Sequence, residues 1–95
     1  MERTQIEAAL ANALEQLAAI EHERWSHWQR YMHSKAVKQP DGSLLIPAEL
    51  VSRWENQMTT PYAKLTDTEK QSDRDQVQKY LPAIVDALHD SSPLG

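Results

Sequence analysis

The chain has 95 residues, a net charge of −4 and no cysteine. This length predicts one domain, which buries only about two-thirds of its unfolded surface and so has little stability to spare. The acidic balance and the scattered basic residues argue against a nucleic-acid partner, and the missing cysteines rule out disulfides and thiolate zinc sites.

No apolar run approaches the ~20 residues that a membrane-spanning helix needs. The N-terminus, Met-Glu-Arg-Thr-Gln, is polar and lacks the apolar region of a signal peptide. We therefore expect a cytoplasmic protein with no membrane partner.

Residues 2–35 predict a long helix, because they lack Pro and Gly and are rich in Ala, Leu, Glu and Gln. Apolar residues recur there every three or four positions, from Ile6 to Met32. A straight helix of this length would measure about 50 Å, whereas a compact domain of this size has a radius of gyration near 13 Å. The first turns must therefore kink back or leave the domain. We interpret residues 1–16 as an extension for oligomerisation with a second copy.

A short hairpin is predicted next. Pro40-Asp41-Gly42 is a turn signal, since Pro fixes φ and Gly reaches positive φ. Residues 36–39 and 43–46 can flank this turn as extended arms.

Two further helices complete the predicted fold. Pro47 is expected at the first position of a helix that runs to about Met58, and residues 59–62 are expected to be extended before and around a proline. Thr66 or Asp67 caps the last helix, and Glu69 would complete a capping box with Thr66.

Pro82 should kink this last helix or split it in two, and residues 91–95 are expected to form a tail. The sequence thus predicts a small, mainly α domain with a long N-terminal helix, a hairpin or extended segment, and a C-terminal helix kinked at a proline.

The segment E-H-E-R-W-S-H-W, residues 21–28, places charges beside the apolar stripe. Glu21 and Arg24 share the face of that stripe, and buried charges require partners. Lys70 and Asp73 are also three residues apart, and they lie toward the apolar side of the last helix. We therefore expect one buried ion network of these four residues.

A second stripe consists of His22, Trp25 and Gln29, at the edge of the core face. It can form a flat, partly polar wall, although periodicity alone favours core-edge packing of Trp25 beside a surface His22. A zinc helix needs two histidines at i and i+4, whereas His22 and His27 lie about 140° apart. We expect no metal, no cofactor and no catalysis, because no nucleophile stands beside a base and two glycines cannot form a phosphate loop.

Two motifs, A-A-I-E-H-E-R-W and T-P-Y-A-K-L-T-D-T-E-K-Q-S-D-R-D-Q-V, together resemble the ryanodine-receptor repeat domain. The similarity covers about residues 17–88, so residues 17–90 form the expected domain. It implies a helical fold with a small-molecule pocket in which adenine nucleotides stack near the tryptophan. Members stand alone in bacteria and phages, where they are thought to sense nucleotide-derived signals. The G-W-x-Y-G-like turn of the family is replaced here by Q-R-Y-M-H-S-K, and Trp28 or Tyr31 is the candidate substitute.

The pocket candidates follow from matching these motifs. The candidates come from the H-x-x-W motif, the P-Y-x-x-L motif and the K-x-x-D-R segment, and Gln29 is added because it follows His22 and Trp25 on the second stripe. They are His22, Trp25, Gln29, Tyr62, Lys70, Asp73 and Arg74. Indole stacking on a base contributes about 1–3 kcal/mol, and Lys or Arg pairs with phosphate.

The expected function is therefore a non-enzymatic binding module for a nucleotide or an NAD-derived or cyclic nucleotide. It would act as a sensor or a sequestering protein, in the second case against host defence if the source is a phage. The alternative is an oligomeric helical interaction module with a degenerate pocket.

Overall fold

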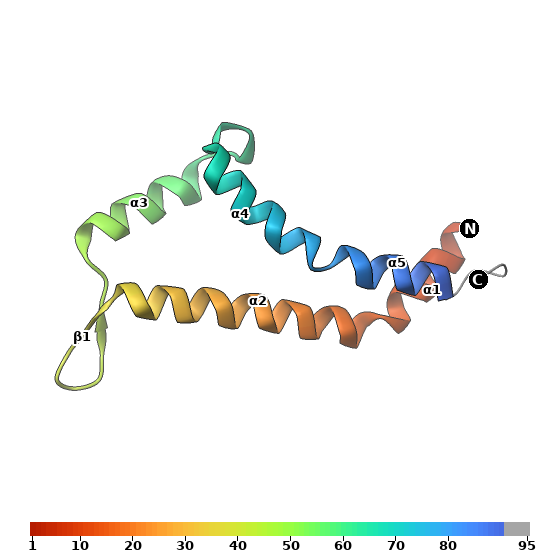
Figure 1. The fold of residues 1–95 in the computed structure, drawn as a ribbon, viewed down its shortest axis with the longest axis horizontal. Helices are drawn as coiled ribbons and strands as arrows, with labels where there is room; N and C mark the ends of the chain where they lie inside the picture. The colour runs from red at the N-terminus through yellow and green to blue at the C-terminus, as the bar shows by residue number, and fades with distance from the viewer. Residues whose placement is uncertain (91–95) are drawn as a thin grey trace.

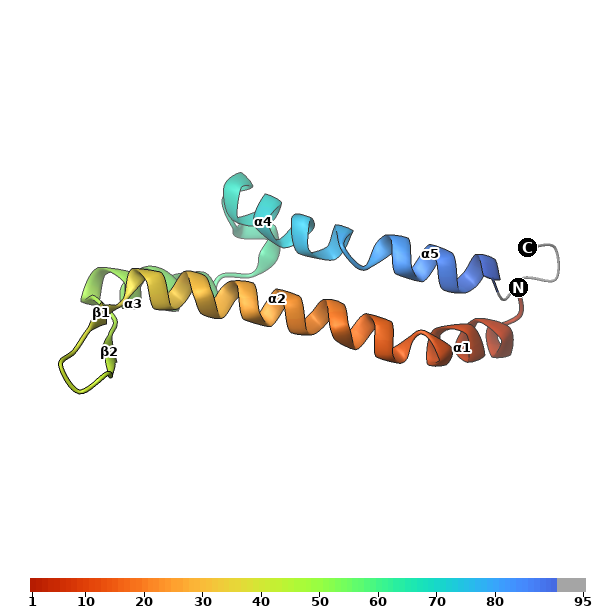
Figure 2. The ribbon, with the colours of Figure 1, turned by 60° about the horizontal axis from the view of Figure 1, so that its bottom comes forward.

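The long N-terminal segment is broken at one residue. In the computed structural model, which describes residues 1–90, it forms α1 (Arg3–Asn12) and α2 (Leu14–Lys35), joined at Ala13. Ala13 has φ −92° and ψ 3°, and its N–H donates to the carbonyls of Leu10 and Ala11. The break lets α1 lie against α5 (Leu81–Asp90), as Figures 1 and 2 show. Of the two alternatives, the kinked one is correct.

Small side chains allow α1 and α5 to approach closely. Ala9 on α1, Ala13 at the joint and Ala83 on α5 are all buried. Burying three methyl groups removes little apolar surface from water, so this contact stabilises the fold only modestly.

The predicted hairpin is confirmed. Strands β1 (Val37–Lys38) and β2 (Leu44–Leu45) pair antiparallel. Gly42 has φ +90° in the turn, and the Asp41 carboxylate accepts hydrogen bonds from the Ser43 N–H at 2.9 Å and hydroxyl at 2.6 Å. The hydroxyl contact is the main reason why the pKa of Asp41 lies below its usual value. The hairpin turns the chain back toward the end of α2.

Helix α3 (Ala48–Thr59) begins one residue later than expected. Pro47 is its N-cap, with ψ 143°, and not its first helical residue, while its carbonyl still accepts the N–H groups of Leu50 and Val51. An N-cap has extended backbone torsions, and Pro adopts these as readily as helical ones.

The expected extended segment 59–62 is shorter in the structure. Thr59 ends α3, where its hydroxyl donates to the Glu55 carbonyl at 3.0 Å. Thr60 and Pro61 are extended, as the proline requires. Tyr62 already begins the 3₁₀ turn η1 (Tyr62–Lys64).

The last helix is split, as Pro82 predicted. Helix α4 (Asp67–Gln78) begins with the predicted capping box between Thr66 and Glu69, with hydrogen bonds of 3.2 and 3.0 Å. After the break at residues 79–80, Pro82 lies in the first turn of α5, where its missing N–H needs no helical partner. The tail predicted at 91–95 lies outside the described residues.

The mainly α fold class is confirmed, and the helices form an open triangular frame (Figure 1). Helix α2 is the long side, while α3 and the α4–α5 segment form the other two. The frame measures 58 × 34 × 18 Å, and its radius of gyration is 18.6 Å, against about 13 Å for a compact domain of this size. Within residues 1–90, no helix is both long and apolar enough to cross a membrane.

Candidate functional site

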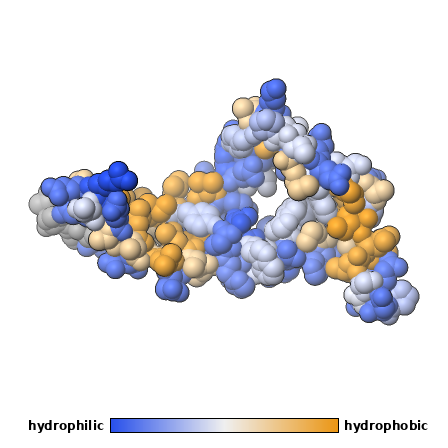
Figure 3. Space-filling model, turned by 180° about the vertical axis from the view of Figure 1, so that it is seen from behind, coloured by the Kyte–Doolittle hydropathy of each residue, from blue (hydrophilic) through white to orange (hydrophobic). Residues whose placement is uncertain are grey.

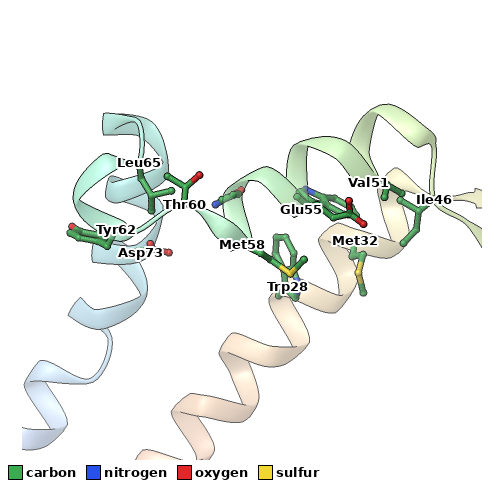
Figure 4. Close-up of a pocket in the computed structure, with 12 residues that line it drawn as sticks. Trp28, Met32, Ile46, Val51, Glu55, Met58, Thr60, Tyr62, Leu65 and Asp73 are labelled. Atoms are coloured by element: carbon green, nitrogen blue, oxygen red, sulfur yellow. The ribbon is translucent and has the colours of Figure 1, made fainter.

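An apolar groove lies between the end of α2, helix α3 and the η1–α4 corner, with a volume of about 660 Å³. We call it the aromatic groove (Figure 4). Its lining is Trp28, Met32, Ile46, Val51, Trp54, Glu55, Gln57, Met58, Thr60, Tyr62, Leu65 and Asp73.

The contact between α2 and α3 forms one side of the aromatic groove. Trp28 meets Trp54 edge to face, with ring centroids 5.7 Å apart, and stacks on Tyr31 at 5.6 Å. Such aromatic pairs contribute about 0.5–1.5 kcal/mol beyond the area that they bury. On α3, Leu50 is buried. The groove-lining residues of this helix, which begin with Val51 and Trp54, follow Leu50 at helical spacing. The amphipathic pattern of α3 therefore directs its tryptophan toward α2.

The opposite side of the groove comes from η1 and α4. In Figure 4, Tyr62, Leu65 and Asp73 stand on this side, separated from the side chains of α2 and α3. The Lys70 ammonium lies 5.8 Å from the Tyr62 ring centroid, a cation–π distance. Glu55 and Asp73 place two carboxylates in the lining. The groove thus combines aromatic faces, two acceptor groups and one cation at its edge.

The His22–Trp25 wall exists, but it lies outside the aromatic groove. The two rings stack with centroids 6.2 Å apart and planes 19° apart. Trp25 and Gln29 line a separate, shallow depression together with Arg30 and His33, and Trp25 is 54% exposed. His22 lines neither hollow. This wall is therefore a surface feature of α2.

The structure does not bring the seven predicted ligand residues together. Tyr62 and Asp73 line the aromatic groove, and Lys70 contacts the Tyr62 ring. Arg74 lies in a third hollow, which residues of α4 line together with His27 of α2.

Sequence reasoning missed most of the groove residues. Trp28 was a candidate substitute for the missing family tryptophan, whereas Trp54 and Met58 were not candidates, since their segment was predicted only as a helix. One signal in the sequence could have indicated the groove. Two tryptophans and three tyrosine or methionine residues lie in or near one helix that has a proline at each end. Their meeting depends on the direction in which the hairpin sends α3.

The predicted ion network has a different composition. Glu21 accepts hydrogen bonds from the Arg24 guanidinium, one of them 2.9 Å long, and from the Tyr80 hydroxyl. These partners, Arg24 first, lower the pKa of Glu21 to about 2, and Glu21 raises the pKa of Arg24 in turn. Lys70 and Asp73 take no part, because they lie at the aromatic groove.

The expected burial of this pair is also wrong. The side chains of Arg24 and Glu21 remain 43% and 49% exposed. The frame is open at this point, so no further helix covers them. A link from α2 to the C-terminal segment is present, but Tyr80 makes it in place of the predicted Lys70 and Asp73.

Residues 1–90 contain no group of three or more His, Asp or Glu side chains arranged to hold a metal ion. Comparison of the chain with protein-family models, curated proteins and solved structures finds no match. The similarity to the ryanodine-receptor repeat therefore remains a prediction.

Proposed function

We propose that the chain is a non-enzymatic binding module for a nucleotide-like ligand, whose flat ring enters the aromatic groove. One observation carries this proposal: a groove of about 660 Å³ that three aromatic side chains line. Small-molecule sites are typically 300–1,000 Å³ in volume, mostly apolar, with a few polar groups that orient the ligand.

The groove chemistry favours a base with exposed N–H groups. A base stacked on Tyr62 or on an indole gains about 1–3 kcal/mol. The carboxylates of Glu55 and Asp73 accept hydrogen bonds from an exocyclic amine or a ring N–H. The same carboxylates repel phosphate, so the phosphate end of the ligand points toward Lys70 at the edge. Such binding would serve sensing or sequestration of nucleotide, NAD-derived or cyclic nucleotide ligands.

A thermal-shift panel tests the proposal directly. AMP, NAD, ADP-ribose and cyclic dinucleotides are added in turn to the full chain. A ligand at 100 times its dissociation constant stabilises the folded state by about 2.7 kcal/mol, or roughly 10–20 °C in Tm for a domain of this size. The absence of a shift with every member of the panel would contradict the proposal.

Two variants then locate the binding site. Tyr62→Ala should weaken the best ligand about 5- to 150-fold, which corresponds to one lost stacking contact. Trp25→Ala is the matched control, because Trp25 is an equally exposed aromatic residue outside the groove. If Trp25→Ala abolishes binding and Tyr62→Ala does not, the ligand sits on the His22–Trp25 wall.

The second candidate function, a helical interaction module, is favoured by the open frame and its exposed apolar side chains. It predicts that no ligand of the panel changes the Tm, while the chain forms an oligomer of defined size. The two functions therefore differ in a measurement that needs no knowledge of the natural partner.

A further inference from the structure

The lining of the aromatic groove carries negative charge and no positive charge. Glu55 of α3 and Asp73 of α4 are the two charged residues among those that line it. Among residues 1–90, neither carboxylate has an ion-pair partner. Figure 4 shows Glu55 on the side that α2 and α3 form, and Asp73 near Tyr62 on the other side. Each side of the groove therefore contributes one unpaired carboxylate.

The rest of the lining suits a flat ring, and above all a charged one. The face of an aromatic ring is the negative end of its quadrupole and attracts a cation, while thioethers make favourable contacts with ring edges. Trp28 and Tyr62 are 43% and 50% exposed, so a ligand can reach both rings. Figure 3 shows hydrophobic surface at the hairpin end of the molecule, where α2 and α3 meet. The groove residues with rings or thioethers are Trp28, Trp54, Tyr62, Met32 and Met58.

We propose that the aromatic groove selects a flat aromatic ring with a fixed positive charge, such as the oxidised nicotinamide ring of a dinucleotide, over a neutral ring of the same size. Stacking and apolar burial act on both rings, whereas the two carboxylates and the ring quadrupoles act on the charge alone. This inference rests on the proposed binding of a nucleotide-like ligand, because it states which ring of that ligand enters the groove. Adenine is neutral at pH 7, so the nicotinamide ring is the one selected.

The edge of the groove has the opposite preference. Lys70 is half-buried, and its ammonium lies 5.8 Å from the Tyr62 ring centroid. An ammonium at this position can pair with a phosphate of the same ligand. A dinucleotide would thus place its positive ring beside Glu55 and Asp73 and its negative phosphates at Lys70, so that the charges are complementary at both ends.

Two small probes of equal shape test the charge preference. The 1-methylnicotinamide cation and the uncharged N-methyl-2-pyridone-5-carboxamide are both flat, and both carry the same methyl and carboxamide groups. Each is titrated into the ¹⁵N-labelled full chain, whose three tryptophans give one indole N–H signal each. We expect the cation to bind about 20-fold more tightly, as one exposed cation–π contact and two exposed ion pairs together provide. Equal affinities of the two probes would overturn the proposal.

The tryptophan signals also locate the bound probe. Trp28 and Trp54 line the groove, whereas Trp25 lies outside it and serves as an internal control. We expect the signals of Trp28 and Trp54 to shift until the site is saturated, and that of Trp25 to stay in place. A shift of the Trp25 signal alone would place the cation on the surface of α2 and refute the groove.

A pair of double variants separates the groove carboxylates from the net charge of the chain. Glu55→Gln with Asp73→Asn should reduce the preference for the cation to about 2- to 5-fold, which exposed ring faces alone provide. Glu49→Gln with Asp75→Asn removes the same two charges from the same two helices, at residues that do not line the groove. This control should keep the full preference. An equal loss in both double variants would overturn the proposal.

NAD⁺ and NADH extend the test to nucleotides, because they share the adenine and the two phosphates and differ in the charge of the nicotinamide ring. Titration calorimetry of the full chain should show tighter binding of NAD⁺ than of NADH, by about the same 20-fold factor. Equal binding of NAD⁺ and NADH would overturn the charge selection and leave the proposed function intact. Binding of the small cation without any nucleotide would contradict the proposed function and retain the charge selection. No binding of any probe or nucleotide would overturn both.

Discussion

Glu21 connects two segments that are 59 residues apart in the chain, through Arg24 on its own helix and Tyr80 at the α4–α5 break. Its pKa of about 2 in the folded state lies below the usual value near 4.3, so the ionised form is the one that the fold stabilises. This contribution is fully present above about pH 4.3 and is lost as the pH falls through about 2.

Glu21→Gln should therefore lower the urea midpoint at pH 7 and leave it close to wild type near pH 2. Circular dichroism at both pH values measures the difference, with Glu23→Gln as the control on the same helix. An equal effect of Glu21→Gln at the two pH values would show that charge is not the cause.

At the scale of single residues, the sequence predicted contacts between two residues of one helix better than it predicted networks that join two segments of the chain. Helical spacing correctly placed Glu21 with Arg24 and His22 with Trp25, because residues three apart meet on any helix. It could not identify Tyr80, since a tertiary partner depends on where the α4–α5 break lies in space.

Helix boundaries depend on local chemistry, and α4 shows this most clearly. The Thr66 hydroxyl accepts the Glu69 N–H while the Glu69 carboxylate accepts the Thr66 N–H. Thr66→Ala should lower the free energy of unfolding by about 1 kcal/mol, and Thr66→Ser should restore most of it. Urea titration followed by helical ellipticity measures both; an effect of Thr66→Ser as large as that of Thr66→Ala would exclude the cap as the cause.

Local signals of this kind made the elements predictable. The Gly42 turn, the Thr66 cap and the Pro82 break all lie where the sequence placed them. The aromatic groove was not predictable in the same way. Trp54 reaches Trp28 only because a two-strand hairpin returns the chain at one particular angle, and spacing does not encode that angle.

The molecule as a whole is unusually open, with a radius of gyration of 18.6 Å. If a second copy supplies the missing core, folding and association form one equilibrium, and the apparent stability depends on protein concentration. If the chain acts as an oligomeric interaction module, we expect Tm to rise when the protein is concentrated, which thermal unfolding at several concentrations measures. A wild-type Tm that does not change on dilution would indicate that the frame is stable alone.

The joint at Ala13 has a consequence for how the bend between α1 and α2 is maintained. Neither Gly nor Pro occurs in residues 2–35, so the local sequence favours an uninterrupted rod. The bend is therefore a tertiary property, imposed where α1 packs against α5 and the three alanines Ala9, Ala13 and Ala83 are buried. A peptide cut from residues 1–35 should lose the bend and keep its helicity. The angle between α1 and α2 thus depends on whether α5 is packed against α1.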